Sequence, residues 1–167
     1  MKKTIVFLFA VCIMLTASVA MAYSAYPTHI NDDNNFIICD GHMGTAWYVD
    51  KSSLVIEKYN PPQYIISVNV VTVNEADQGN TDIARVKTFR FFYNYDLGKM
   101  FVDRDGQSNW RYLEPWGCWA DTGISMPAGE IAFYLAYKQK FYGVLSRYSQ
   151  YSQKYYHPFD DSFYAKI

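Results

Sequence analysis

The chain has 167 residues, half of them hydrophobic, with 15 basic and 16 acidic side chains and a formal charge of −1. A charge so close to neutral, with basic residues dispersed along the sequence, argues against a protein that binds nucleic acid through phosphate contacts. The length fits one domain that buries a hydrophobic core without help from a metal.

Residues 1–22 have the order of a secretory signal peptide. Two lysines precede an apolar run over residues 5–15, and a small-residue cleavage site follows at residues 20–22. Cleavage would leave a single secreted domain, residues 23–167, with 13 basic and 16 acidic residues and a formal charge of −3. A retained membrane anchor is the alternative, but the apolar run is shorter than the about 20 residues of a spanning helix. The sequence therefore predicts a protein of the periplasm or cell surface, with no transmembrane segment after cleavage.

Cleavage would also leave two of the three cysteines, Cys39 and Cys118. Two cysteines in an oxidising compartment most simply form one disulfide. Such a bridge would enclose about 80 residues and stabilise the fold by about 4 kcal/mol on the chain-entropy model. A pair of buried free thiols is the alternative.

The first part of the secreted domain is predicted to be an extended arm followed by a β-rich region. Residues 23–35 combine a proline with short polar residues, as in a loop. Between residues 36 and 115, alternating apolar and polar residues separated by turn signals predict strands. Residues 36–39 form a short apolar run, and we expect strands at residues 46–50, 53–58, 64–73, 84–95, 99–104 and 109–113. Their short connections predict an antiparallel meander of five or six strands.

The last part, residues 126–157, is predicted to be helical. Its apolar residues recur with a period near 3.6, and residues 125–130 suit the start of a helix. Pro158 would end that helix, and Gly143 would weaken its middle by about 1 kcal/mol relative to alanine, so two shorter helices are the alternative. The predicted fold is thus an α+β domain in which the antiparallel meander packs against a long C-terminal helix.

Tyrosine is the compositional outlier, because eight of the 16 tyrosines lie at or after residue 134. A tyrosine offers an apolar ring with a polar tip, which suits a contact surface for a protein or a glycan. Tyr148, Tyr151 and Tyr155 are therefore candidate binding residues. The alternative is that these rings pack on the sheet as part of an amphipathic helix.

Two of the four tryptophans, Trp116 and Trp119, flank Cys118 in a short segment over residues 114–121. Aromatic rings on a loop can stack on a sugar or anchor a partner, so both are candidate binding residues. The alternative is a lid over the core, since tryptophan is highly buried on average.

The sequence predicts no catalytic residues, metal or cofactor. Side chains of the metal-binding type gather near the start of the secreted domain without the spacing of a known metal site: His29, Asp32, Asp33, Asp40 and His42. Cys39 and His42 lie close enough in the sequence to suggest a thiol-protease pair, but such a pair would need a free thiolate and an orienting third group. Motifs of serine nucleophiles and phosphate-binding loops are absent. Hydrolysis by two carboxylates has no fixed spacing and stays an alternative.

Parts of the β-rich region resemble small secreted bacterial proteins related to surface-adhesin protein E. The resemblance covers residues 45–113 and rests on the motifs WYVDKSS at 47–53 and KTFRF at 87–91, with Trp110 further on. It implies a β-rich envelope or surface module that binds a partner without catalysis; adhesin relatives bind host proteins or haem. No binding residue is carried over from the group. Two other classes remain as alternatives, a periplasmic inhibitor of a lytic enzyme and a small secreted hydrolase.

Overall fold

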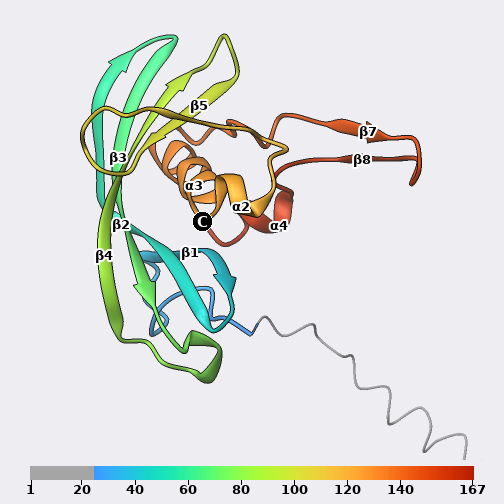
Figure 1. Cartoon of the computed structure of the whole chain (residues 1–167). Helices are drawn as coiled ribbons and strands as arrows, with labels where there is room; N and C mark the ends of the chain where they lie inside the picture. Colours follow the sequence, from blue (N-terminus) through green and yellow to red (C-terminus); the bar gives the residue numbers. More distant parts are fainter. Residues whose placement is uncertain (1–24) are drawn as a thin grey trace, which may run out of the picture.

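A computed structural model of the chain describes residues 25–167, so the predicted signal peptide lies outside the described residues. Six strands form the main sheet: β1 (Phe36–His42), β2 (Thr45–Asn60), β3 (Gln63–Val73), β4 (Ile83–Asn94), β5 (Lys99–Asp103) and β6 (Arg111–Leu113). The other elements are the 3-10 turn η1 (Ala76–Gln78), the helices α2 (Trp119–Thr122), α3 (Ser125–Tyr137) and α4 (Asp161–Tyr164), and the strands β7 (Arg147–Ser149) and β8 (Lys154–Tyr156). The main sheet is antiparallel and follows sequence order, and α3 lies in the hollow of this curled sheet (Figure 1).

The predicted α+β class with a long C-terminal helix is wrong, although the antiparallel strand order is present. Residues 25–167 are mostly β, and the helices among them are short. Within the predicted helical region 126–157, the helix ends at Tyr137, because Lys138 adopts a left-handed conformation with φ 53°. The Lys138 N–H donates to the Tyr134 carbonyl at 2.8 Å, which closes the last turn. Residues 147–156 form the β7–β8 hairpin, which projects away from the sheet (Figure 1).

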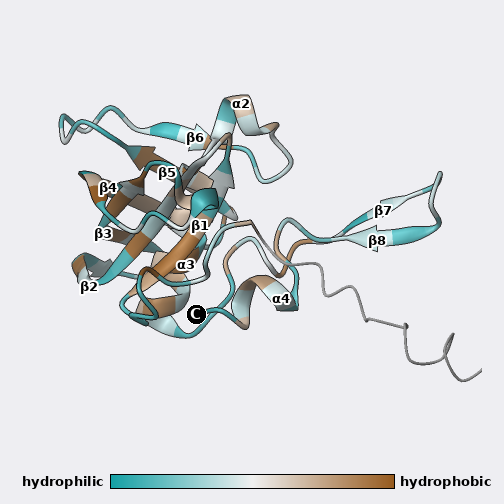
Figure 2. Cartoon of the chain, turned by 90° about the horizontal axis from the view of Figure 1, so that it is seen from below, coloured by the Kyte–Doolittle hydropathy of each residue, from teal (hydrophilic) through white to brown (hydrophobic). Residues whose placement is uncertain are grey.

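The predicted alternation along β3 and β4 is confirmed. Side chains of one face of each strand are buried against α3, among them Ile66, Val68, Phe89, Phe91 and Tyr93. Figure 2 shows hydrophobic residues concentrated on the sheet and α3, whereas the β7–β8 hairpin is mainly hydrophilic or neutral. The main core therefore lies between the sheet and α3.

Close approach of α3 to the sheet depends on Gly129. A Cβ atom at this position would overlap the Met100 Sδ atom and lie 2.9 Å from a ring carbon of Phe91. The hydroxyl of Tyr93 donates to the Gly129 carbonyl at 2.7 Å. Helix and sheet backbones can approach at this point because glycine has no side chain.

A second, smaller core lies on the other face of β2 and β3. It contains the buried residues Ile30, Ala46, Tyr48, Val71, Val73 and Ala76. The predicted extended arm covers it, since the Tyr48 hydroxyl donates to the Pro27 carbonyl at 3.1 Å and the Gly44 N–H donates to the Tyr26 hydroxyl at 3.0 Å. The arm is thus part of the folded domain.

The two strands predicted at residues 46–50 and 53–58 are one strand, β2, with an irregular register. Pairing with β3 shifts between Asp50 and Val55. The Asp50 carboxylate accepts hydrogen bonds from the Ser52 N–H at 3.0 Å and the Ser52 hydroxyl at 2.6 Å. The predicted break at Lys51-Ser52 is therefore a β-bulge.

No helix within residues 25–167 combines the length and apolarity needed to cross a membrane.

Candidate binding groove

A groove of about 850 Å³ lies between the β7–β8 hairpin and residues 115–117. The hairpin contributes residues 147–151 and 156 to its lining, residues 157–158 directly after the hairpin also line it, and Trp116 lines it from the other side. Met126, in the first turn of α3, also lines the groove. The groove therefore brings together three segments that are separate in the sequence.

The hairpin is held by cross-strand pairs and by a contact at its base. Tyr148 pairs with Tyr155, and their ring centroids lie 5.1 Å apart. At the tip, the Ser152 N–H donates to the Ser149 hydroxyl oxygen at 3.3 Å. At the base, His157 Nδ1 lies 2.9 Å from the Leu145 carbonyl oxygen, within hydrogen-bonding distance. Ring pairs of this kind stabilise a short hairpin beyond its backbone hydrogen bonds.

Solvent exposure separates the three candidate binding tyrosines from the core tyrosines of the C-terminal region. The exposed fractions of Tyr148, Tyr151 and Tyr155 are 50%, 101% and 67%, whereas Tyr142 and Tyr164 are buried. The three predicted binding tyrosines therefore stand in solvent, and the alternative of a stripe packed on the sheet is wrong for them. Tyr148 and Tyr151 line the groove together with Trp116, while the structure places Tyr155 against Tyr148.

Trp119 does not share this groove. It is the first residue of α2, and its Nε1 donates to Asp40 Oδ2 at 2.5 Å, with its ring centroid 4.7 Å from that of His42. It lines a neighbouring pocket of about 310 Å³ together with Cys39. Gly117 and Met126 line both hollows, so the two sites have a common wall.

Both cysteines of the described chain are free thiols in the structure. Cys39 is buried, and burial raises the pKa of its thiol to about 12. Cys118 is exposed and donates to an Asp121 carboxylate oxygen at 2.9 Å. The contact between Asp40 and Trp119 joins the residues that directly follow the two cysteines. The disulfide between Cys39 and Cys118 stays a prediction.

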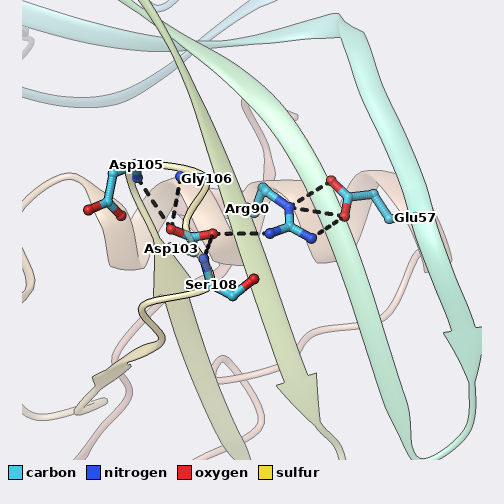
Figure 3. A network of polar contacts seen from close by, with 6 residues as sticks. All are labelled: Glu57, Arg90, Asp103, Asp105, Gly106 and Ser108. Atoms are coloured by element: carbon cyan, nitrogen blue, oxygen red, sulfur yellow. Dashed lines mark hydrogen bonds and ion pairs between the residues drawn. The ribbon is translucent and has the colours of Figure 1, made fainter.

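A polar network crosses the outer face of the main sheet (Figure 3). The Arg90 guanidinium donates to Glu57 at 2.7 Å and to Asp103 at 3.0 Å. Asp103 also accepts from the backbone N–H of Gly106 and Ser108, each at 3.0 Å. These carboxylates link β2, β4 and β5 and hold the loop after β5, which gives them a structural role.

The cluster of potential metal ligands near the arm is dispersed by other contacts. His29 Nδ1 lies 2.8 Å from the Phe36 carbonyl oxygen, and Asp40 accepts from Trp119. Within residues 25–167, no three His, Cys, Asp or Glu side chains are arranged to hold a metal ion. Among the described residues that line the groove there is no carboxylate either.

Arg147, Tyr156 and His157 line the groove but were not predicted from the sequence. A signal for them exists, since residues 144–159 contain no acidic residue and include Arg147, Lys154 and His157. The prediction of a helix concealed this signal, because a helix would place the basic residues on a solvated face opposite the tyrosines.

Comparisons of the chain with protein-family models, with curated proteins and with solved structures find no match. The resemblance of residues 45–113 to the surface-adhesin group stays a prediction. The groove and its exposed rings are therefore the basis for assigning a function.

Proposed function

We propose that this protein is a non-catalytic binding module, exported to the periplasm or the outside of the cell, and that it holds its partner in the hairpin groove. The observation that supports this most is the exposure of Tyr148 and Tyr151 around a groove lined by Trp116. Large aromatic rings left in solvent on a projecting element are typical of binding surfaces, where Tyr and Trp supply most of the binding energy.

The composition of the hairpin supports a protein partner. Its residues 147–156 are Arg, Tyr, Ser, Gln and Lys only. Tyrosine and serine are the residues that dominate antibody contact loops, because tyrosine gives contact area at low entropic cost and serine gives adaptable hydrogen bonds. A lining without carboxylates favours recognition over carboxylate-pair hydrolysis.

The proposal is tested on arrays of purified extracellular proteins and of glycans, probed with the wild-type protein and two variants. We expect one or more bound proteins whose affinity falls by at least about tenfold in Tyr148→Ala, the usual effect of removing a central aromatic contact. Tyr112→Ala is the matched control, since Tyr112 is 37% exposed and lies on β6, outside the groove. Equal loss in both variants, or binding unchanged in Tyr148→Ala, would contradict the proposal.

An inhibitor of a lytic enzyme is the second candidate, supported by the shape of the hairpin. The hairpin projects as a separate arm (Figure 1), and Tyr151 near its tip is fully exposed, so the arm could enter an enzyme cleft. Inhibition of a lysozyme that is relieved by Tyr151→Ala would favour this candidate. Unchanged lysozyme activity at a saturating concentration of this protein would exclude inhibition of that enzyme.

A further inference from the structure

The groove follows an edge of strand β7. Its lining includes the consecutive residues 147–151. Successive side chains of a strand point to opposite faces, so a hollow on one face would contact only alternate residues. All three residues of β7, Arg147–Ser149, line the groove, which indicates that it reaches the edge of this strand as well as one face. Gln150 and Tyr151 line it from the turn, and Tyr156 lines it from β8.

That edge has no strand partner among the described residues. The two-stranded sheet pairs β7 with β8 from Arg147–Tyr156 to Ser149–Lys154, which uses one edge of β7. In residues 25–167, no backbone hydrogen bond joins β7 to any segment other than β8. The other edge therefore presents backbone N–H and C=O groups that an added strand could pair with.

The groove also carries local positive charge. Arg147 lines it, and Lys154 lies on the paired strand. Residues 144–159 contain no Asp or Glu, although the whole chain has a formal charge of −1. Neither Arg147 nor Lys154 takes part in a salt bridge within the described part of the chain. Carboxylates of a bound segment would complement these groups.

We propose that the groove takes an extended segment of a partner protein, rich in Asp or Glu, that adds to the free edge of β7 as a third strand. This rests on the proposed function and specifies its ligand. Strand β7 offers an edge of three residues, Arg147–Ser149, about 10 Å long at the usual strand rise. A groove volume of about 850 Å³ lies within the range of ligand sites, about 300–1,000 Å³.

The side chains around the edge suit the alternating residues of such a strand. Trp116 and Tyr148 provide apolar ring surface, and Arg147 provides a fork of donors for a carboxylate. A strand that alternates acidic and apolar residues would direct the two kinds of side chain to opposite faces. An anionic glycan would satisfy the charge, but it lacks the regular N–H and C=O groups that a strand edge pairs with.

Fluorescence anisotropy with labelled synthetic peptides tests this proposal on the full secreted domain. The probe is a short peptide of alternating glutamate and valine. The first comparison peptide has the same sequence with alternate backbone nitrogens methylated, and the second alternates lysine and valine. We expect the Glu-Val peptide to bind, and each comparison peptide to bind at least about tenfold more weakly. Binding should weaken at high salt.

Two charge-reversal variants locate the site. Arg147→Glu should weaken binding of the Glu-Val peptide at least about tenfold, because it replaces attraction by repulsion. Lys99→Glu is the matched control, since Lys99 is exposed on β5, away from the groove, and should leave binding within about twofold. Both residues are exposed, so neither variant should unfold the domain.

The possible outcomes separate this inference from the proposed function. Equal binding of the methylated peptide would overturn strand addition, and preferential binding of oligogalacturonate with the same dependence on Arg147 would assign the groove to glycans. In both cases the groove would remain a binding site. A domain that binds none of the peptides would overturn the acidic-strand inference, while the array experiment with Tyr148→Ala would still decide the proposed function.

Discussion

Glu130 and Tyr164 are 34 positions apart in the sequence and are joined in the core by a hydrogen bond of 2.5 Å from the tyrosine hydroxyl to the carboxylate. The same carboxylate accepts the backbone N–H of Phe141 and of Tyr142, each at 2.8 Å, and of Gly143 at 3.3 Å. This buried side chain thus joins α3, the turn that follows it and α4. The β7–β8 hairpin begins at Arg147, shortly after the turn that Glu130 holds.

Replacing Glu130 by glutamine should destabilise the protein by about 3 kcal/mol. The amide has one accepting oxygen where the carboxylate has two, so buried N–H donors would lose their partner at about 1–3 kcal/mol each. Urea unfolding followed by circular dichroism measures the change. Glu75→Gln, at an exposed position of the β3–β4 connection, is the control and should stay within about 0.5 kcal/mol of the wild type. Equal stability of both variants would show that Glu130 does not hold these segments.

Replacing Gly143 by alanine should destabilise the protein by about 2 kcal/mol. A Cβ atom here would overlap the Tyr164 hydroxyl oxygen and lie 2.7 Å from its Cζ atom, and overpacking of this kind costs about 1–3 kcal/mol. The predicted continuous helix has the opposite consequence, a gain of about 1 kcal/mol from replacing a helical glycine. The sign of the change in unfolding free energy therefore distinguishes the two structures.

Stability should fall as the pH rises above about 10. Burial raises the pKa of Tyr48 to about 12, and burial also raises the pKa of Tyr93, Tyr142 and Tyr164 above the ordinary value of 10.0. Their raised pKa values mean that the unfolded chain releases these protons at a lower pH than the folded protein does. The stabilisation that these buried tyrosines contribute is fully present below pH 10. It is lost as the pH rises above 10, by up to about 1.4 kcal/mol per pH unit for each tyrosine.

Tyrosinate absorbance and near-ultraviolet circular dichroism, recorded together during an alkaline titration, test this dependence. We expect the last tyrosines to ionise only as the circular dichroism of the folded state disappears. Ionisation of all 16 tyrosines in a protein that keeps its near-ultraviolet signal would refute the assignment of the buried set.

Truncation of the hairpin tyrosines should change stability little, in contrast to the core tyrosines. Tyr151→Ala should alter the free energy of unfolding by less than about 0.5 kcal/mol, because the ring is fully exposed. Tyr142→Ala should cost about 3–5 kcal/mol, since its ring is buried and its hydroxyl bridges the Leu113 carbonyl and the Met100 N–H. A large loss in Tyr151→Ala would mean that the hairpin belongs to the core.

The predicted disulfide is tested by alkylation under denaturing conditions without reduction. If the exported protein pairs Cys39 with Cys118, no thiol will be labelled, and its mass will be lower by two hydrogens. Reduction should then lower the free energy of unfolding by about 4 kcal/mol. Two labelled thiols would establish the free pair, in which exposed Cys118 should react in the folded state and buried Cys39 only after unfolding.

The sheet could be predicted from the sequence because its signal is local. Alternation along β3 and β4 places one face of each strand in the core, and turn residues separate the strands. The bulge after Asp50 could not be distinguished from a strand break, because the same short polar residues favour both.

The region after Tyr137 could not be predicted in this way because tertiary contacts determine it. The helix ends at Tyr137, and the Glu130 carboxylate then binds the N–H groups of residues 141–143, a contact that no local pattern reveals. Tyr148, Tyr151 and Tyr155 happen to match a helical repeat, although they lie on a short hairpin. Their rings stand in solvent, so the prediction that they form a contact surface stays open, but their position opposite Trp116 depends on how the hairpin folds against residues 115–117.

Site-specific photocrosslinking tests the central claim, that the hairpin groove is the binding surface, most directly. A photoreactive phenylalanine analogue replaces Tyr151 near the hairpin tip or, as the control, Tyr112 on β6, and the cells that make the protein are irradiated. Our account predicts a discrete protein adduct at position 151 that is absent at position 112. An adduct at position 112 with none at position 151 would contradict it.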